Sequence, residues 1–555
     1  MKKLLIILLF GIFLNGLSQP FPKSGLPISH DQWYVALEST EAANGDYIAQ
    51  WCVNYIDLVF NTRIGDYTYS IINGNTGDAF SINSSGMIIV NDYTELTYGS
   101  NYTLTIQTCI GGICESNYAY ITVLDDAKTI FIDPPYGAGG NGNRATPYDS
   151  WADVSSKTIG YTYLQKRGTT ATISATVGCT VANVNFCAYG TGITPIIAGN
   201  VSPEGFYITG DHCAMYDLYF DEATSNSDYS VLKIECDYFR SHRTTVMAGG
   251  TAEDCIYLYD GNIGSSIHDF VGYDSDAHII KCHGTYDTIV NVYVQDPVTN
   301  AHGISLAAGS NFYLRYIWSV HNGGGNCGIE VNASDVDIAY AYIQGFYRGI
   351  GVLDDIEPVD DILISSVYVD QTLRGAGADC GLLVQDNVTD VLVKNSTFLN
   401  STDGIYVTSN ASRVDIQNCI GRSNTGSGIE CASTSDYVKV YNSLFYNNTA
   451  IDVYDNTSGT HNECKNTIYK DISGTWTTAT NYDYDLGDPW IDKTNNDFHL
   501  KLYTNCIEYG TDIGLTSDFE NRTKYRKWPI GPLYFNEDDY LISKGKAIRN
   551  QAIIF

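Results

Sequence analysis

The chain has 555 residues, which is enough for two or more domains, and its formal net charge is −32 at neutral pH. Because such an acidic surface repels phosphate groups, the charge argues against nucleic acid and anionic membranes as partners. The 15 cysteines are an odd number, so at least one of them is unpaired.

Residues 1–19 have the pattern of a signal peptide. Lys2 and Lys3 precede an apolar run from Leu4 to Leu14, and small or polar residues follow it. No cysteine directly follows the apolar run, and no later stretch is long and apolar enough to span a bilayer. We therefore expect a secreted bacterial protein that is cleaved near residue 19 and is extracellular or at the cell surface.

Residues 26–124 predict a small β-sandwich. Short strand-like runs alternate with turns at 33–38, 67–72, 86–90, 102–106 and 118–123. The order of these runs resembles a cadherin-like (Ig-type) domain. The sequence Leu-Thr-Tyr-Gly at 96–99 stands where cadherins carry an acidic calcium-binding turn, so we expect a calcium-poor spacer or adhesion module that contacts the cell surface. Cys109 and Cys114 predict a disulfide across a hairpin.

A short phrase recurs through the second half of the chain: a small residue, then Ile or Leu, then a polar residue. Its apolar anchors are Ile279, Ile304, Ile329, Ile350, Leu382, Ile405, Ile429 and Ile451, in steps of 25, 25, 21, 32, 23, 24 and 22 residues. A period of this size indicates a solenoid. The alternating runs between anchors indicate strands, and no helical period interrupts them. Pairing each coil with the next gives an all-β fold, a parallel β-helix.

Stacking of the coils explains two further residue types. Asn395, Asn418 and Asn442 share one register, so their buried amides can bond to one another between coils. Five cysteines near strand ends are expected to be buried apolar thiols: Cys282, Cys327, Cys380, Cys419 and Cys431.

Both ends of the segment 129–535 resemble secreted right-handed β-helix proteins of the pectate-lyase-like superfamily. The opening carries Thr-Ile-Phe-Ile-Asp at 129–133, a Gly/Asn turn at 139–143 and Ala-Thr-Pro-Tyr at 145–148; matching phrases near the other end lie at 488–490, 496–500, 510–514 and 530–534. The resemblance implies a right-handed parallel β-helix with a capping helix at its start, followed by a short tail at 536–555. This architecture hosts lyases, hydrolases, epimerases and binding proteins.

Seven of the ten histidines lie between residues 212 and 321, together with several of the scarce cations. Because stacked coils bring residues some 21 to 26 positions apart together, we expect one cationic face. Such a face suits β-elimination of an acidic, uronate-containing polysaccharide such as pectate or alginate. That reaction needs a base, an acid and a positive group at the carboxylate.

The candidate residues for this chemistry fall into three groups. Lys281 or Arg315 would act as the base, with help from His283, His302 or His321. Arg348, Arg243 and Arg374 would bind substrate carboxylates. Asp274, Asp276 and Glu330 are candidate ligands for Ca²⁺ in the same groove, and no other cofactor is expected.

Three alternatives remain open. The phrase Ala-His-Gly-Ile-Ser at 301–305 resembles the Gly-His-Gly-Ile-Ser of polygalacturonase-type hydrolases, although the Arg-Ile-Lys phrase of that family is replaced by Gly-Ile-Glu-Val at 328–331. A non-catalytic adhesin or glycan-binding β-helix fits the same fold. A trimeric tailspike-like fibre fits it too, but the cleavable signal disfavours that reading.

Overall fold

The computed structural model describes residues 31–37, 42–53, 67–110, 113–154, 156–199, 204–222, 229–249, 252–295, 301–354, 358–374, 379–457, 461–479, 482–483, 490–492 and 497–500. The predicted signal peptide, the tail at 536–555 and the phrases at 510–514 and 530–534 lie outside these residues. The chain forms two compact units, which we call the first unit (26–358) and the second unit (359–555, with 1–25).

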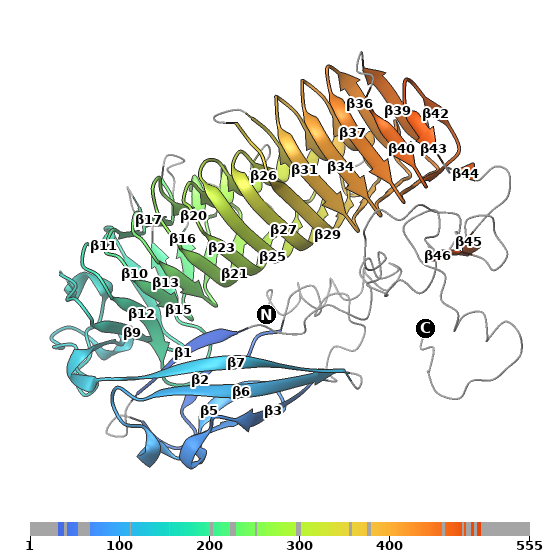
Figure 1. Cartoon of the computed structure of the whole chain (residues 1–555). Coiled ribbons are helices and arrows are strands. Elements are labelled where there is room, and N and C mark those ends of the chain that lie inside the picture. Colours follow the sequence, from blue (N-terminus) through green and yellow to red (C-terminus); the bar gives the residue numbers. More distant parts are fainter. Residues whose placement is uncertain are drawn as a thin grey trace, which may run out of the picture. The chain divides into compact units, whose positions relative to one another are not determined.

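The first unit begins with two small sheets (Figure 1). One has the order β1 (Gln32–Leu37), β7 (Ile113–Leu124), β6 (Asn101–Ile110) and β3 (Thr68–Asn73), and the other has the order β2 (Tyr47–Gln50), β5 (Met87–Val90) and β4 (Phe80–Ile82). Side chains from both sheets share one core, in which Ile88, Leu104 and Ile121 are almost fully buried. The two sheets and their common core are those of a β-sandwich, and the likeness to cadherins stays a prediction. The predicted disulfide between Cys109 and Cys114 is confirmed.

The rest of the first unit is a stack of parallel coils built from two sheets. The long sheet contains β8 (Thr129–Ile132), β9 (Thr162–Lys166), β10 (Thr170–Ile173), β12 (Asn185–Tyr189), β13 (Ile196–Gly199), β15 (Ala214–Tyr216), β16 (Tyr219–Glu222), β18 (Arg240–His242), β19 (Thr245–Met247), β21 (Ser266–Tyr273), β23 (Thr288–Gln295), β25 (Ser310–Val320) and β27 (Ser334–Gln344). The short sheet has the order β11 (Val177–Cys179), β14 (Phe206–Ile208), β17 (Leu232–Ile234), β20 (Asp254–Leu258), β22 (His278–Cys282), β24 (His302–Leu306), β26 (Cys327–Val331) and β28 (Arg348–Val352).

The second unit repeats this pattern. One sheet contains β29 (Ile362–Asp370), β31 (Thr389–Lys394), β32 (Thr397–Leu399), β34 (Ser412–Gln417), β35 (Ile420–Arg422), β37 (Asp436–Tyr441), β38 (Leu444–Tyr446), β40 (Glu463–Lys465), β41 (Ile468–Tyr469), β43 (Thr477–Ala479) and β44 (Tyr482–Asp483). The other contains β30 (Cys380–Val384), β33 (Asp403–Val407), β36 (Ile429–Ser433), β39 (Val453–Thr457) and β42 (Ile472–Ser473), and a separate hairpin joins β45 (Trp490–Asp492) to β46 (Asp497–Leu500). The predicted parallel β-helix is therefore confirmed.

Helical structure is scarce in the described residues. It consists of five 3₁₀ turns: η1 (Thr76–Asp78), η2 (Tyr93–Glu95), η3 (Asp126–Lys128), η4 (Pro134–Tyr136) and η5 (Trp151–Asp153). The capping helix implied by the family resemblance is thus only the single turn η5, in which the buried Trp151 donates a hydrogen bond from Nε1 to Gln165 Oε1 at 2.7 Å. Within the described part of the chain, no helix has the length and apolar character needed to span a bilayer.

The sequence anchors pair as predicted along most of the stack. Ile304 pairs with Ile329 in the first unit, and Leu382 pairs with Ile405 in the second. Two anchors were wrong. The residue paired with Ile304 is Ile280, not Ile279, and both are fully buried, so hydrophobicity alone does not distinguish them. At the other end, Val453 pairs with Ile429, whereas Ile451 stays half-buried.

Where a glycine precedes an anchor, the neighbouring coil leaves no room for a side chain, whereas Ile279 and Asp452 occupy the same position before the anchors Ile280 and Val453. A Cβ on Gly303 would lie 2.5 Å from the carbonyl oxygen of Gly328, and a Cβ on Gly404 would lie 2.5 Å from that of Gly428. Because the obstacle is backbone of the next coil, it cannot move aside cheaply. The repeated small residue thus reflects coil packing.

The polar and sulfur residues of the stack also lie where they were expected. Asn418 Nδ2 donates a hydrogen bond to Asn395 Oδ1 at 3.0 Å, as predicted, whereas the buried side-chain amide of Asn442 makes no hydrogen bond to the described residues, so the predicted amide ladder joins two of its three members. Both residues, and Asn442, have φ between 49° and 54°, the left-handed conformation that asparagine tolerates better than most residues. The five predicted cysteines are fully buried: Cys282, Cys327, Cys380, Cys419 and Cys431.

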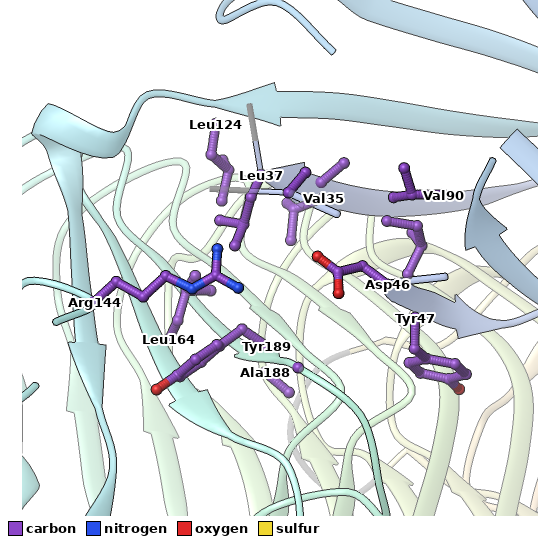
Figure 2. Close-up of a pocket in the computed structure, with 14 residues that line it drawn as sticks. Val35, Leu37, Asp46, Tyr47, Val90, Leu124, Arg144, Leu164, Ala188 and Tyr189 are labelled. Carbon is purple, nitrogen blue, oxygen red and sulfur yellow. The ribbon is translucent and has the colours of Figure 1, made fainter. Parts of the chain in front are cut away.

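Within the first unit, sandwich side chains pack on the first coils. Trp33, Val35 and Leu37 contact a cluster that includes Phe131 and Leu164. A cavity of about 30 Å³ lies in this region, and Figure 2 shows the residues that line it. Ligand pockets are about ten times larger or more, so the cavity is too small for a sugar.

Candidate functional site

The outer side chains of the short sheet form a row that crosses successive coils. We call it the outer row; its members pair in register from β14 to β26 and are Tyr207, Lys233, Tyr257, Lys281, Ser305 and Glu330. Neighbouring members lie on coils about 4.8 Å apart. Of these six side chains only Ser305 is fully buried, so the row offers contacts at nearly every step, as a long unbranched polymer requires.

Strand alternation explains why these side chains lie on the outside. In β20 and β22, Ile256, Leu258, Ile280 and Cys282 are fully buried. The residue between each pair, Tyr257 or Lys281, is partly exposed. A strand in a β-helix buries alternate side chains in the core and leaves the others for function.

The two lysines of the outer row lie against aromatic rings. Lys233 Nζ is 4.7 Å from the centre of the Tyr259 ring and 3.0 Å from Glu235 Oε1. Lys281 Nζ is 4.8 Å from the centre of the Tyr257 ring and 3.7 Å from Glu253 Oε1. Each ammonium group thus has an aromatic face and a carboxylate beside it.

His283 follows β22 and lies next to this row. Its Nδ1 is hydrogen-bonded to Asp260 Oδ1, and its ring meets the Tyr257 ring edge to face at 5.3 Å between centres. Burial lowers the pKa of His283, more than the charge and hydrogen bond of Asp260 raise it, and the nearby Lys281 and His278 lower it further. The ring is therefore neutral near neutral pH, with its proton on Nδ1 and a lone pair on the buried Nε2, which has no hydrogen-bond partner.

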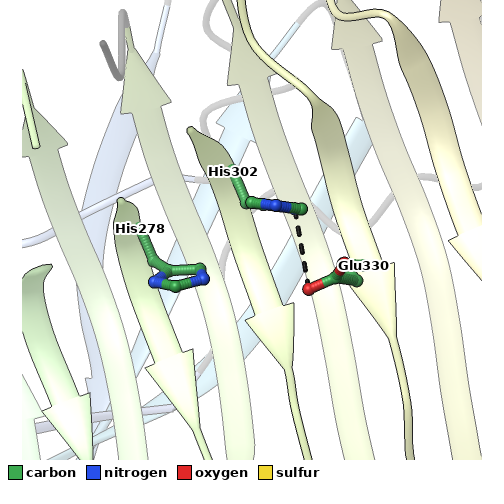
Figure 3. A group of neighbouring side chains, drawn as sticks. All are labelled: His278, His302 and Glu330. Carbon is green, nitrogen blue, oxygen red and sulfur yellow. Dashed lines mark ion pairs between the residues drawn. The ribbon is translucent and has the colours of Figure 1, made fainter. Parts of the chain in front are cut away.

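Three further side chains meet on neighbouring strands (Figure 3): His278 and His302 begin β22 and β24, and Glu330 lies near the end of β26. The His278 and His302 rings stack at 5.3 Å between centres, and His302 Nδ1 is 3.6 Å from Glu330 Oε2. Burial lowers the pKa of His302 to about 4; Glu330 opposes this shift, whereas His278 and Arg348 add to it. In the part of the chain that the structure describes, this is the one group of three whose ligand atoms are spaced to hold a metal ion, all within 4.8 Å of one another.

Of the five predicted catalytic residues, Lys281 and His302 lie on the short sheet, and His283 directly follows β22. Arg315 lies on β25 of the long sheet, where its guanidinium stacks on Tyr313 at 3.8 Å and pairs with Asp337. His321 directly follows β25; only 7% of it is exposed, and its Nδ1 accepts a hydrogen bond from the Gly324 amide at 2.7 Å. The structure therefore places three of the five on or directly after strands of the short sheet and the other two on or directly after a strand of the long sheet.

The predicted substrate-binding arginines are scattered. Arg348 begins β28, near enough to His302 to affect its pKa. Arg243 is buried beneath the sandwich, where its Nε donates to Asp217 Oδ1 at 2.9 Å and its guanidinium lies 4.2 Å from the centre of the Tyr34 ring. Arg374 belongs to the second unit, in the turn after β29.

The predicted calcium ligands are also divided. Glu330 lies in the group of Figure 3, whereas Asp274 and Asp276 lie in the turn between β21 and β22 and are not part of that group. Their role as calcium ligands stays a prediction.

The sequence interpretation missed several partners in this site, namely Glu253, Asp254, Tyr257 and Asp260. A signal for one of them was present. Asp254 precedes the anchor Ile256 by two positions, as His278 precedes Ile280, so correct anchors would have placed Asp254 beside His278. The hydrogen bond between Asp254 Oδ1 and His278 Nδ1 is 2.8 Å long.

The second unit has a different surface feature. An open depression of about 400 Å³ lies over β31, β34 and β37 and is lined by side chains that include Asp390, Arg413, Asp415, Tyr437 and Lys439. Its size is within the range of ligand sites. Its charges are paired at the surface, with Arg413 bonded to Asp390 and Lys439 Nζ 3.9 Å from Asp415.

Comparisons with known proteins find similarity in structure alone. No protein-family model matches the chain, and no curated protein matches it. The A-module of mannuronan C-5 epimerase AlgE6 from Azotobacter vinelandii is 13% identical, with 58% of this chain and 91% of that chain covered and a TM-score of 0.38. The catalytic unit of a GH87 alpha-1,3-glucanase from Streptomyces thermodiastaticus is 11% identical, with 75% and 87% covered and a TM-score of 0.38. Pectate lyase Pel9A is 11% identical, with 74% and 96% covered and a TM-score of 0.27. Similarities at this level identify no activity for this chain.

Proposed function

We propose that this chain is a secreted polysaccharide-active enzyme that binds its substrate along the outer row and cleaves a uronate-containing polysaccharide by β-elimination. The observation that carries the proposal is the grouping of Tyr257, Lys281 and His283. A neutral imidazole, an ammonium group and a phenol lie within ring-contact distance on two adjacent coils.

These three side chains match the three needs of the reaction. His283 takes the proton from the carbon beside the uronate carboxylate after a rotation of its ring exposes Nε2, which is buried in the structure, and Asp260 stabilises the imidazolium that forms. The Lys281 ammonium faces the carboxylate, whose negative charge grows as the carbon–hydrogen bond breaks. Burial raises the pKa of Tyr257, so its phenol keeps its proton and can give it to the leaving oxygen. A carbon–carbon double bond forms as the glycosidic carbon–oxygen bond breaks.

The test uses the full-length protein and a panel of pectate, alginate and glycosaminoglycans. Elimination creates a conjugated uronate, so ultraviolet absorbance should rise with one member of the panel. His283→Ala should lower this rate about 100-fold or more, and Lys281→Met should lower it as well. His461→Ala is the matched control, because it removes another aspartate-paired histidine, which lies in the second unit.

A panel without any rise in absorbance, or a His283→Ala variant as fast as the wild type, would contradict the lyase proposal. The candidate role of Ca²⁺ is checked in the same assay by adding EGTA and then restoring Ca²⁺.

A second candidate is non-catalytic glycan binding, with the sandwich as an adhesion module. This second function is favoured by the paired charges at the outer row: Lys233, Lys281 and the neighbouring His283 each have a carboxylate partner. Paired charges offer hydrogen bonds to sugar hydroxyls without attracting an acidic polymer. Retention in affinity electrophoresis without any cleavage would support this function, whereas new reducing ends without ultraviolet absorbance would indicate hydrolysis.

A further inference from the structure

We propose that His278, His302 and Glu330 form a binding site for a divalent transition-metal ion such as Zn²⁺. The three residues come from consecutive coils, on β22, β24 and β26 (Figure 3). His278 and His302 pair directly in register. The site shares Glu330 with the outer row, but the proposal rests on the geometry of the three ligands and not on the proposed reaction.

The spacing of the ligand atoms suits such an ion. All three lie within 4.8 Å of one another, and the pair His302 Nδ1 and Glu330 Oε2 is already 3.6 Å apart. Tetrahedral zinc with bonds of about 2.1 Å holds its ligand atoms about 3.4 Å apart. Small side-chain rotations therefore close the site without moving the backbone of the stacked strands.

Two neighbouring groups orient the ligands. Asp254 is fully buried and binds Nδ1 of His278, which leaves the other ring nitrogen with its lone pair. A carboxylate behind a histidine in this way is typical of metal sites. Ser305 Oγ donates a hydrogen bond to Glu330 Oε2 at 2.7 Å, which fixes that carboxylate.

His302 provides an independent sign of a missing partner. Its Nδ1 is buried and has no hydrogen-bond partner, which is costly for a polar atom. Its Nε2 lies 3.3 Å from the side-chain amide of Asn326. The oxygen and nitrogen of that amide are assigned from the hydrogen-bond network, so the oxygen can equally face an Nε2 proton. The Nδ1 lone pair then points to the space shared with Glu330.

The chemistry of the ligands selects the class of metal. Two imidazoles and one carboxylate suit Zn²⁺, Co²⁺ or Ni²⁺, whereas Ca²⁺ prefers six or more oxygen ligands. Asp254 and Glu330 bring two negative charges that offset the charge of the ion. Three protein ligands leave one position open for water or an oxygen of a bound molecule.

The test is isothermal titration calorimetry of the metal-free full-length protein with zinc chloride and, separately, with calcium chloride. We expect one zinc ion per chain with micromolar or tighter affinity, and no effect of calcium on zinc binding. Glu330→Gln keeps the shape of the side chain and should weaken zinc binding at least 10-fold; His278→Ala and His302→Ala should weaken it more. Asp254→Asn should weaken it about 10-fold through the orientation of His278. His461→Ala should bind zinc as the wild type does.

The proposal is overturned if the wild type binds no stoichiometric zinc, or if Glu330→Gln and His302→Ala bind it unchanged. Near-ultraviolet circular dichroism shows whether each variant keeps its tertiary structure, and cobalt absorption in the visible range reports the ligands directly. No polysaccharide enters these measurements, so a failed lyase assay and a failed metal titration are separate results.

Discussion

The two units hold their charged side chains in different surroundings. In the first unit, Arg243, Asp217, Asp254 and Asp287 are buried or nearly so, each beside a few fixed partners. In the second unit, pairs such as Arg413 with Asp390 lie at the surface, where the two side chains are 57% and 38% exposed. Burial weakens the screening of charges by water, so buried groups acquire shifted pKa values. The pKa of Asp287 in the first unit is raised to about 7, and burial also raises the pKa of Asp403 and Glu430 in the second unit.

The repeat itself does not account for this difference. In the second unit an asparagine recurs at one corner of the coils. The coils of the first unit that carry the candidate site are as regular, since Leu232, Ile256, Ile280 and Ile304 follow one another at steps of 24 residues. The repeat therefore specifies the fold, and the histidines, lysines and tyrosines at the outer positions specify the candidate chemistry.

The largest effect is expected from the buried pair of Arg243 and Asp217. Arg243→Ala should lower the free energy of unfolding by about 3–5 kcal/mol, because it leaves the Asp217 carboxylate buried with less compensation. Urea denaturation followed by tryptophan fluorescence measures the loss. The double variant Arg243→Met with Asp217→Asn removes both charges and should recover part of it. A loss below about 1 kcal/mol would show that this pair is solvated like a surface pair.

The next effect concerns the pH dependence of stability. Burial raises the pKa of Asp287 to about 7 from the ordinary 3.8, although a hydrogen bond from the Ser265 amide opposes the shift. The folded state therefore binds this proton more tightly than the unfolded chain. The contribution to stability is complete below about pH 4 and is lost as the pH rises to about 7, up to about 4 kcal/mol in total.

The variant Asp287→Asn tests this assignment, because its side-chain oxygen can still accept the Ser265 hydrogen bond. Urea midpoints measured between pH 4 and pH 8 should fall less steeply for the variant than for the wild type. Parallel profiles for the two proteins would mean that Asp287 does not titrate in this range.

The smallest effect is expected in the second unit. Arg413→Ala removes an exposed ion pair with Asp390, and such pairs contribute little because water and salt screen them. The urea midpoint of the variant should match that of the wild type within error at physiological salt. A shift as large as that of Arg243→Ala would erase the contrast between the two units.

Most of the fold was predictable from the sequence, because anchors such as Ile304, Ile329 and Ile405 recur at steps that match one coil. The same steps led to the prediction that all five candidate catalytic residues share one cationic face, which is right only in part: Lys281 and His302 lie on the short sheet, and His283 directly follows β22. The anchors could not assign Arg315 and His321 to the long sheet. An anchor gives the position of a coil in the stack, whereas the turns between strands determine to which of the two sheets a residue belongs. The partners of His278 and His302 depend on side-chain rotations that no spacing specifies.

Each coil of the stack pairs only with the coil before it and the coil after it, so the number of coils can change without altering the others. Duplicating or deleting one whole coil keeps every strand in register, so the outer face can lengthen or shorten by about 4.8 Å at a time without redesign of the core. The number of coils therefore sets the length of the outer face. Duplication or deletion of the gene segment that encodes one coil would adapt this face to a longer or a shorter polymer.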